Sequence, residues 1–194
     1  MVSYPKYGKP FEPGEFYHVY NQAVGNQNIF LSSENYRFFL DKYRIYAKDN
    51  FSTYAFCLLK NHFHFLIKVH DKTQVDQTSE RFRRLFISYA KSFNKNYNRK
   101  GALFEKHFKR VKIESNEQLL WTIYYIHRNP VHHNVVKSFK KFRWSSYPVI
   151  LSNKNTRLKR REVFKLFTNR EKFIEFHERN ILEDKLLGKI NFKE

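Results

Sequence analysis

The stretch FSTYAFCLLKNHFHFLIKV, residues 51–69, decides the fold of this chain. Its two halves are rich in aromatic and β-branched residues, which favour extended strands. Between the halves lie Lys60 and Asn61, which suit a tight turn. The stretch therefore predicts two antiparallel strands that form a hairpin.

Two histidines, His62 and His64, lie two positions apart in the second predicted strand. Side chains alternate across a strand, so both imidazoles point to one face while Phe63 and Phe65 point to the other, into the core. Two neighbouring imidazoles can bind a divalent metal ion. On these residues alone, a pair of ordinary strand histidines is the more common interpretation.

The elements predicted around the hairpin alternate in type. In chain order they are a strand over 15–22, a helix over 34–48, the hairpin, a helix over 79–96, a strand over 108–114 and a helix that begins after the capping box of Ser115 and Gln118. Pro130 predicts the end of that last helix, because the residue before a proline avoids helical backbone. The order β-α-β-β-α-β-α predicts an α+β fold, in which helices pack on an antiparallel sheet.

The predicted helix over 79–96 has one aromatic and one cationic face. Its apolar stripe is Phe82, Leu85, Phe86, Tyr89 and Phe93, and its polar stripe is Arg84, Ser88, Lys91 and Lys95. The aromatic face is expected to pack against the sheet.

A tyrosine and an asparagine share one face of the helix that follows Ser115. Tyr125 and Asn129 are four residues apart, which places them one turn apart on the same side. Taken alone, Tyr125 is also typical of a packing residue beside an apolar stripe, and Tyr124 is a rival candidate for any tyrosine chemistry.

The composition limits the class of protein. Of 194 residues, 41% are hydrophobic and 19% aromatic, which excludes a mainly disordered chain. The formal net charge of +19 predicts a polyanionic partner, either nucleic acid or an acidic membrane surface. A single cysteine, Cys57, excludes an internal disulfide framework and a cysteine-only zinc site. With no signal-like apolar core and no membrane-length apolar run, we expect a cytoplasmic protein without a membrane partner.

Two regions are predicted along the chain. Residues 1–150 carry the alternating elements and form the main domain. Residues 151–194 form a C-terminal extension, which starts with the basic linker LSNKNTRLKRR (151–161) and continues as a helical segment from Glu162 to about Leu187.

Several stretches together resemble one known family. CLLKNHFHFLI (57–67) resembles the His-hydrophobic-His strand of the single-tyrosine HUH transposases, and YYIHRNPVHHNVV (124–136) resembles their Tyr-x-x-x-Asn/Gln helix. The chain is most similar to the REP-associated tyrosine transposases, the branch that recognises repetitive extragenic palindromes. Further similar stretches are YHVYNQAVGNQNIF (17–30), GALFEKHFKRVKIES (101–115) and RWSSYP (143–148). The resemblance covers residues 14–150, and it departs from the family at His107, where an arginine is expected.

This resemblance implies a ferredoxin-like HUH fold and a specific chemistry. Tyr125 would be the nucleophile, and His62, His64 and Asn129 would bind Mg²⁺ or Mn²⁺. The reaction would be cleavage and transfer of single-stranded DNA through a 5′-phosphotyrosine, at hairpin or palindromic DNA. The protein would act as a monomer or a homodimer associated with the nucleoid. A phenol has a pKa of about 10, so a tyrosine nucleophile needs activation at neutral pH.

Eleven basic residues are candidates for contact with DNA, although each alone is more often a solvated surface charge. They are Arg81, Arg84, Lys91 and Lys95 on one helix, Lys109, Arg110 and Lys112 on the last strand, and Arg157, Lys159, Arg160 and Arg161 in the basic linker.

Two other hypotheses stay open. The chain could be a single-stranded DNA or hairpin binding protein that derives from a transposase and has lost catalysis. It could also be a basic RNA-associated structural protein, in which His62, His64 and Tyr125 are core residues. Convergence of these three side chains on one accessible pocket would favour the hypotheses in which DNA is bound.

Overall fold

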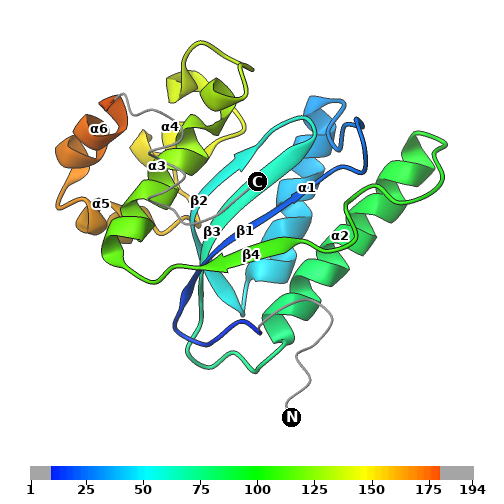
Figure 1. Ribbon diagram of the computed structural model, residues 1–194, viewed down its shortest axis with the longest axis horizontal. Coiled ribbons are helices and arrows are strands. Elements are labelled where there is room, and N and C mark those ends of the chain that lie inside the picture. Colours follow the sequence, from blue (N-terminus) through cyan, green and yellow to red (C-terminus); the bar gives the residue numbers. More distant parts are fainter. Residues whose placement is uncertain (1–9, 180–194) are drawn as a thin grey trace.

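A four-stranded antiparallel sheet forms the centre of the computed structural model, which describes residues 10–179 (Figure 1). The strands are β1 (Phe16–Gln22), β2 (Phe51–Leu58), β3 (His62–Val69) and β4 (Lys109–Lys112), in the order β2-β3-β1-β4. The predicted hairpin is confirmed, because β2 pairs with β3 and places Cys57 opposite His64. The order leaves β3 and β1 in the middle of the sheet, where both faces of each strand can be covered.

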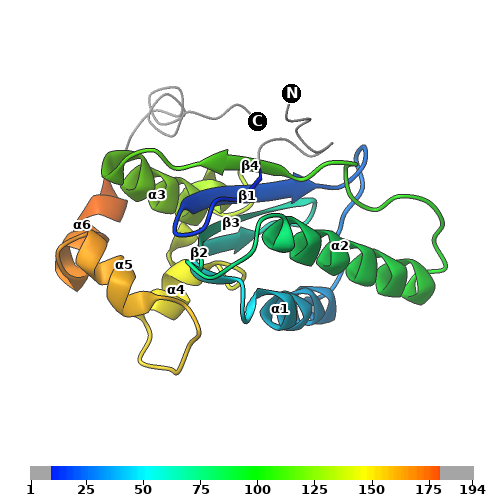
Figure 2. The same cartoon turned by 90° about the horizontal axis from the view of Figure 1, so that it is seen from below.

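Two long helices cover one face of the sheet. They are α1 (Ser33–Ala47) and α2 (Gln77–Asn96), which lie side by side beneath the sheet in Figure 2. Phe63 and Phe65 of β3 are fully buried in this layer, together with the aromatic stripe predicted for α2. The outward stripe of Lys91 and Lys95 remains exposed, as its helical spacing predicts.

A second group of helices packs around the other face and one end of the sheet (Figure 1). It contains α3 (Asn116–His132), the short 3₁₀ helix η1 (Phe139–Lys141), α4 (Ser146–Leu151), α5 (Arg160–Leu166) and α6 (Arg170–Glu178). The α3 helix contacts β2 and β3, and its buried Ile123 and Ile126 belong to this second core. No helix within residues 10–179 is long and apolar enough to cross a membrane.

The α3 helix begins as predicted but ends later. Ser115 Oγ accepts a hydrogen bond from the Gln118 backbone N–H at 3.1 Å, and Gln118 Oε1 accepts one from the Glu114 N–H at 2.7 Å. The predicted end near Pro130 is wrong, because the helix continues to His132. Asn129 and Pro130 are both buried, so tertiary packing outweighs the local preference against helix before proline.

Within the described residues 151–179, the C-terminal region forms two helices, α5 and α6, rather than one. The single segment predicted from Glu162 is interrupted at Thr168, which has a φ of 78°, and Asn169 Oδ1 then caps α6 by accepting from the Lys172 N–H at 2.8 Å. Residues 180–187 of that segment lie outside the described residues. The segment before α5 packs on the sheet, since the Lys159 N–H donates to the Thr53 carbonyl at 3.0 Å. The domain boundary at residue 150 stays a prediction.

Candidate active site

The histidines of β3 face the layer that contains α3. His62 and His64 lie on the same side of the strand, with ring centroids 5.2 Å apart. Phe63 and Phe65 fill the opposite core, which fixes the orientation of the whole strand. The alternation predicted from the sequence is therefore confirmed, and both imidazoles are held on a rigid central strand.

The α3 helix supplies an amide directly opposite His62. Asn129 is fully buried, and its Oδ1 lies 3.0 Å from His62 Nε2. The other ring nitrogen, His62 Nδ1, lies 2.9 Å from Asn61 Oδ1. A neutral imidazole has only one N–H, so at one of these contacts a nitrogen lone pair faces an amide oxygen. If that lone pair belongs to His62 Nε2, the ring nitrogen and Asn129 Oδ1 both direct electron pairs into the space between them. Such a pair of donor atoms suits a cation.

His64 is held by a second buried histidine. His18 Nε2 of β1 lies 2.9 Å from His64 Nδ1, and the two residues are 1% and 2% exposed. Burial, and then the neighbouring His18, His62 and His133, hold the pKa of His64 well below its usual range. The Nε2 atom of His64 is buried and has no hydrogen-bond partner. A neutral His64 with this nitrogen deprotonated would be ready to bind a metal ion.

Tyr125 lies beside these histidines. Its ring meets the ring of His64 edge-on at a centroid distance of 5.5 Å and that of His18 at 6.1 Å. The ring of His132 lies 5.6 Å away on the other side. Tyr125 is only 1% exposed and does not line the cavity beside the histidines, so the three side chains lie close together but do not converge on one accessible pocket.

Tyr124, the rival tyrosine, lies away from this site. Its hydroxyl donates to the Arg179 carbonyl at 2.6 Å. Its ring packs against Trp121 and Phe176, which belong to the contact between α3 and α6. The structure therefore separates the two tyrosines, and only Tyr125 lies with the histidines.

A cavity of about 80 Å³ opens beside the histidines. Its lining residues are Tyr20, Asn21, Gln22, His62, His64, Glu105, His107, Lys109 and His133. Tyr20 stacks against His64 at 5.6 Å, and Lys109 Nζ lies 5.6 Å above the Tyr20 ring. His18 and Tyr20 were missed by the sequence reasoning. The period-two alternation of the β1 segment, which puts both on the same face as His64, could have found them.

The donor atoms fit a divalent metal ion only if the amide takes part. Within residues 10–179, no group of three or more His, Cys, Asp or Glu side chains is arranged to hold a metal. Two imidazoles with Asn129 give two nitrogens and one oxygen. Adjacent ligands of an octahedral ion with bonds of about 2.1 Å lie roughly 3 Å apart, close to the separation of His62 Nε2 and Asn129 Oδ1. This separation and the unpartnered His64 Nε2 fit such an ion.

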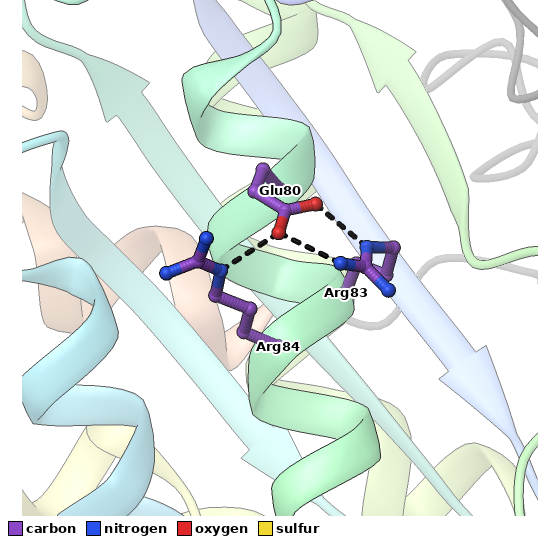
Figure 3. Close-up of polar contacts among 3 residues, drawn as sticks. All are labelled: Glu80, Arg83 and Arg84. Atoms are coloured by element: carbon purple, nitrogen blue, oxygen red, sulfur yellow. Dashed lines mark hydrogen bonds and ion pairs between the residues drawn. The ribbon is translucent and has the colours of Figure 1, made fainter.

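The basic residues on α2 and β4 differ in their surroundings. Lys109 lies on the cavity, whereas Arg110 donates to Ser79 Oγ at 2.6 Å and Lys112 forms an ion pair with Glu12 at 2.7 Å. Figure 3 shows Glu80 of α2 between the guanidinium groups of two neighbouring arginines, Arg83 and Arg84. Lys91 and Lys95 are exposed, and Arg81 is half-buried.

The basic residues near α5 lie at the other edge of the sheet. The segment contacts β2, and β2 and β4 are the two edge strands. Arg160 Nη2 donates to the Val149 and Lys154 carbonyls at 2.8 Å, and Lys159 Nζ lies 3.4 Å from Glu162. Arg157 and Arg161 are exposed. The structure therefore does not bring this cluster together with Lys109.

One solved structure has a similar fold. It is described as a REP-associated tyrosine transposase bound to a REP hairpin, and it matches with a TM-score of 0.64 and 18% sequence identity. The match covers 79% of this chain and 87% of that chain. No protein-family model matches the sequence, and no curated protein matches it. This likeness and the four-stranded antiparallel sheet confirm the predicted α+β fold.

Proposed function

We propose that this chain is a metal-dependent transposase that cleaves single-stranded DNA beside a hairpin and transfers the strand through Tyr125. One observation carries the proposal. The Tyr125 ring lies 5.5 Å from His64, and one helical turn later Asn129 Oδ1 lies 3.0 Å from His62. The nucleophile and one candidate metal ligand, Asn129, thus share the rigid helix α3, which packs beside the two histidines of β3. The fold of a hairpin-bound transposase supports the class of substrate.

His62, His64 and Asn129 would hold the metal ion, Mg²⁺ or Mn²⁺. When bound there, the ion supplies Lewis-acid polarisation of the scissile phosphate. The protein contributes the fixed positions of the ligands. His64 is held by His18, and Asn129 is held by the buried end of α3.

Tyr125 would carry the covalent chemistry. Its phenol loses a proton and attacks the phosphorus, the bond from phosphorus to the 3′-oxygen breaks, and that oxygen leaves as a 3′-hydroxyl. The product is a 5′-phosphotyrosine. Attack by another 3′-hydroxyl reverses the step and rejoins a strand, so no nucleotide cofactor is needed.

The cavity and its charges would position the strand. Lys109 lies beside His62 and His64 and can contact a backbone phosphate. The net charge of +19 favours binding to polyanions in general. A monomer or a homodimer bound to DNA in the cytoplasm is consistent with this function.

The burial of Tyr125 imposes a condition and favours a second candidate function. At 1% exposure, the hydroxyl of Tyr125 cannot meet a phosphate until the residues that cover it move. If they never move, the protein binds hairpin DNA without cleaving it. Such a protein would be a transposase-derived binding protein.

A cleavage assay distinguishes the two candidates. The probe is a DNA hairpin with single-stranded flanks, labelled at either end and incubated with Mn²⁺ or with a chelator. Because the tyrosine takes the 5′-phosphate, only the 3′-labelled DNA should migrate with the protein on a denaturing gel. Tyr125→Phe should abolish this band, and Tyr124→Phe should retain it. Salt-sensitive binding without any covalent band would support the binding protein.

A further inference from the structure

A second cavity adjoins the candidate active site. It measures about 450 Å³, within the usual range for pockets that bind small molecules. It shares two lining residues, Asn21 and Glu105, with the active-site cavity. The side-chain amide of Asn21 donates to the Glu105 carbonyl at 3.3 Å, so this contact marks the boundary of the two cavities. The two cavities are therefore neighbours, separated only by this contact.

The walls of the second cavity are aromatic. Phe86 of α2 lies 5.1 Å from Phe104 and 5.6 Å from Phe108, measured between ring centroids. Ile87 of α2 completes the apolar lining and is 41% exposed. Phe86 and Phe104 are each only 8% exposed, so the half-buried Phe108 provides the stacking surface for a flat ligand.

The rim of the second cavity is polar and balanced in charge. Its charged lining residues are three acids, Asp76, Glu80 and Glu105, and three bases, Arg83, Lys106 and Arg110. Glu80 and Arg83 are joined by two hydrogen bonds of 2.6 and 2.8 Å, as Figure 3 shows. Such a rim offers both donors and acceptors, which suits a neutral ligand with a polar edge.

A third cavity shows the contrast. It measures about 780 Å³ and lies between α1, β2 and residues 155–158. Its lining residues include Arg44, Lys48 and Arg157, and none of the described residues that line it is a carboxylate. An excess of cations suits a phosphate. The second cavity, which has no such excess, suits an uncharged part of a nucleotide.

We propose that the second cavity binds one unpaired nucleobase of the DNA strand whose backbone occupies the active-site cavity. The inference rests on the proposed function. Phe108, which is only half-buried, would stack on the base, and the Glu80–Arg83 pair would meet its hydrogen-bonding edge. Because the cavities share Asn21 and Glu105, the base would belong to a nucleotide next to the scissile phosphate.

A binding experiment with abasic DNA tests this inference. The probes are hairpins with short oligo-dA, oligo-dC or oligo-dT flanks, and each flanking position in turn lacks its base. A chelator prevents cleavage during the titration. We expect one flanking position at which removal of the base lowers affinity about tenfold, because one stacked base is lost.

Two matched variants connect that position to the cavity. Ile87→Glu introduces a charge at the exposed wall, and Ile45→Glu introduces the same charge at an isoleucine of α1 that is 67% exposed and does not line this cavity. Ile87→Glu should weaken binding of intact DNA, and the abasic change should then cause no further loss. Ile45→Glu should respond to the abasic change as the unmodified protein does.

Two results would overturn the inference. One is that no flanking position is sensitive to loss of its base. The other is that the fold-losses in affinity caused by Ile87→Glu and by the abasic change multiply when the two are combined. Multiplication would mean that the base and the cavity act independently. A parallel incubation of intact probes with Mn²⁺ separates this failure from failure of the proposed function. If a covalent protein–DNA band forms but either of these two results is found, only the base pocket is rejected. If the protein neither binds the hairpin nor forms the band, the proposed function itself is rejected.

Discussion

His18 is the residue that most directly controls a candidate metal ligand. A histidine that binds a metal through one nitrogen generally donates its other N–H to a fixed acceptor. His18 Nε2 lies 2.9 Å from His64 Nδ1 and can be that acceptor, which leaves His64 Nε2 to bind the ion. His18 is therefore a positioning residue, and its effect should appear in metal binding before any DNA is added.

We predict that His18→Phe lowers the affinity for Mn²⁺ by about 10- to 100-fold, because His64 loses its acceptor. His18→Gln retains an acceptor and should lose less. Isothermal titration of the DNA-free protein with Mn²⁺ measures both variants, and circular dichroism checks that each is folded. Equal Mn²⁺ affinity in folded His18→Phe and unmodified protein would rule out this role.

The two adjacent tyrosines should respond differently to loss of the hydroxyl. Tyr124→Phe removes a hydrogen bond of 2.6 Å to the Arg179 carbonyl, so it should cost about 1 kcal/mol of stability. Chemical denaturation measures this loss. A variant as stable as the unmodified protein would argue that this bond contributes nothing to holding α6 on α3.

Contacts between helices α3, α4 and α6 depend on two buried histidines in their neutral form. His177 Nδ1 lies 2.7 Å from the Phe173 carbonyl, so it must donate there. His177 Nε2 lies 2.9 Å from His127 Nδ1, and His127 Nε2 lies 2.7 Å from Ser146 Oγ, whose hydroxyl donates to the Phe56 carbonyl at 3.2 Å. Every ring nitrogen of the two histidines thus has a polar neighbour, and burial holds the pKa of both rings below the usual histidine value.

Acid should therefore loosen this part of the molecule. Burial lowers the pKa of His177 to about 3, while the unfolded chain has a histidine pKa of about 6.5. Below about pH 6.5 the unfolded chain binds a proton on this histidine and the folded protein does not. The free energy of unfolding therefore decreases by about 1.4 kcal/mol for each unit by which the pH is lowered. Thermal unfolding followed from about pH 7 to about pH 5 tests this, with a loss near 2 kcal/mol from His177 alone. His177→Phe should show a shallower pH dependence, and an unchanged slope would contradict the assignment.

Periodicity predicts most of the elements because it is a local signal. The alternation of β3 placed His62 and His64 correctly, and the 3.6-residue period of α2 placed its aromatic face. The end of α3 was predicted too early because the burial of Asn129 and Pro130 depends on distant contacts. The break at Thr168 was missed because no glycine or proline marks it.

The same limit applies to the site. Tyr125 and Asn129 could be paired by helical spacing, but only the fold shows that His18 supports His64 from another strand. The burial of Tyr125 has no signal in the sequence. Arg110, Lys112 and Arg160 look like their exposed neighbours in the sequence, yet each is held by contacts within the protein.

The distribution of charge over the molecule predicts how DNA binding depends on salt. Lys109 lies at the active-site cavity beside the β4 edge, whereas Lys165 of α5 is exposed near the opposite edge. For single-stranded DNA, each phosphate contact contributes about 0.7 to the slope of log affinity against log salt. Lys109→Ala should reduce that slope by roughly one contact, and Lys165→Ala should leave it unchanged. Fluorescence anisotropy across a salt series provides the slopes, and identical slopes for both variants would remove Lys109 from the interface.

The central claim is that Tyr125 forms a covalent bond with DNA, and peptide mapping of the adduct tests it most directly. The protein is incubated with Mn²⁺ and hairpin DNA, the DNA and the protein are digested, and fragment-ion spectra locate the added nucleotide within residues 113–128. We predict a 5′-phosphate ester on Tyr125 and none on Tyr124. An adduct on any other residue, or no adduct while the hairpin is bound tightly, would contradict the account.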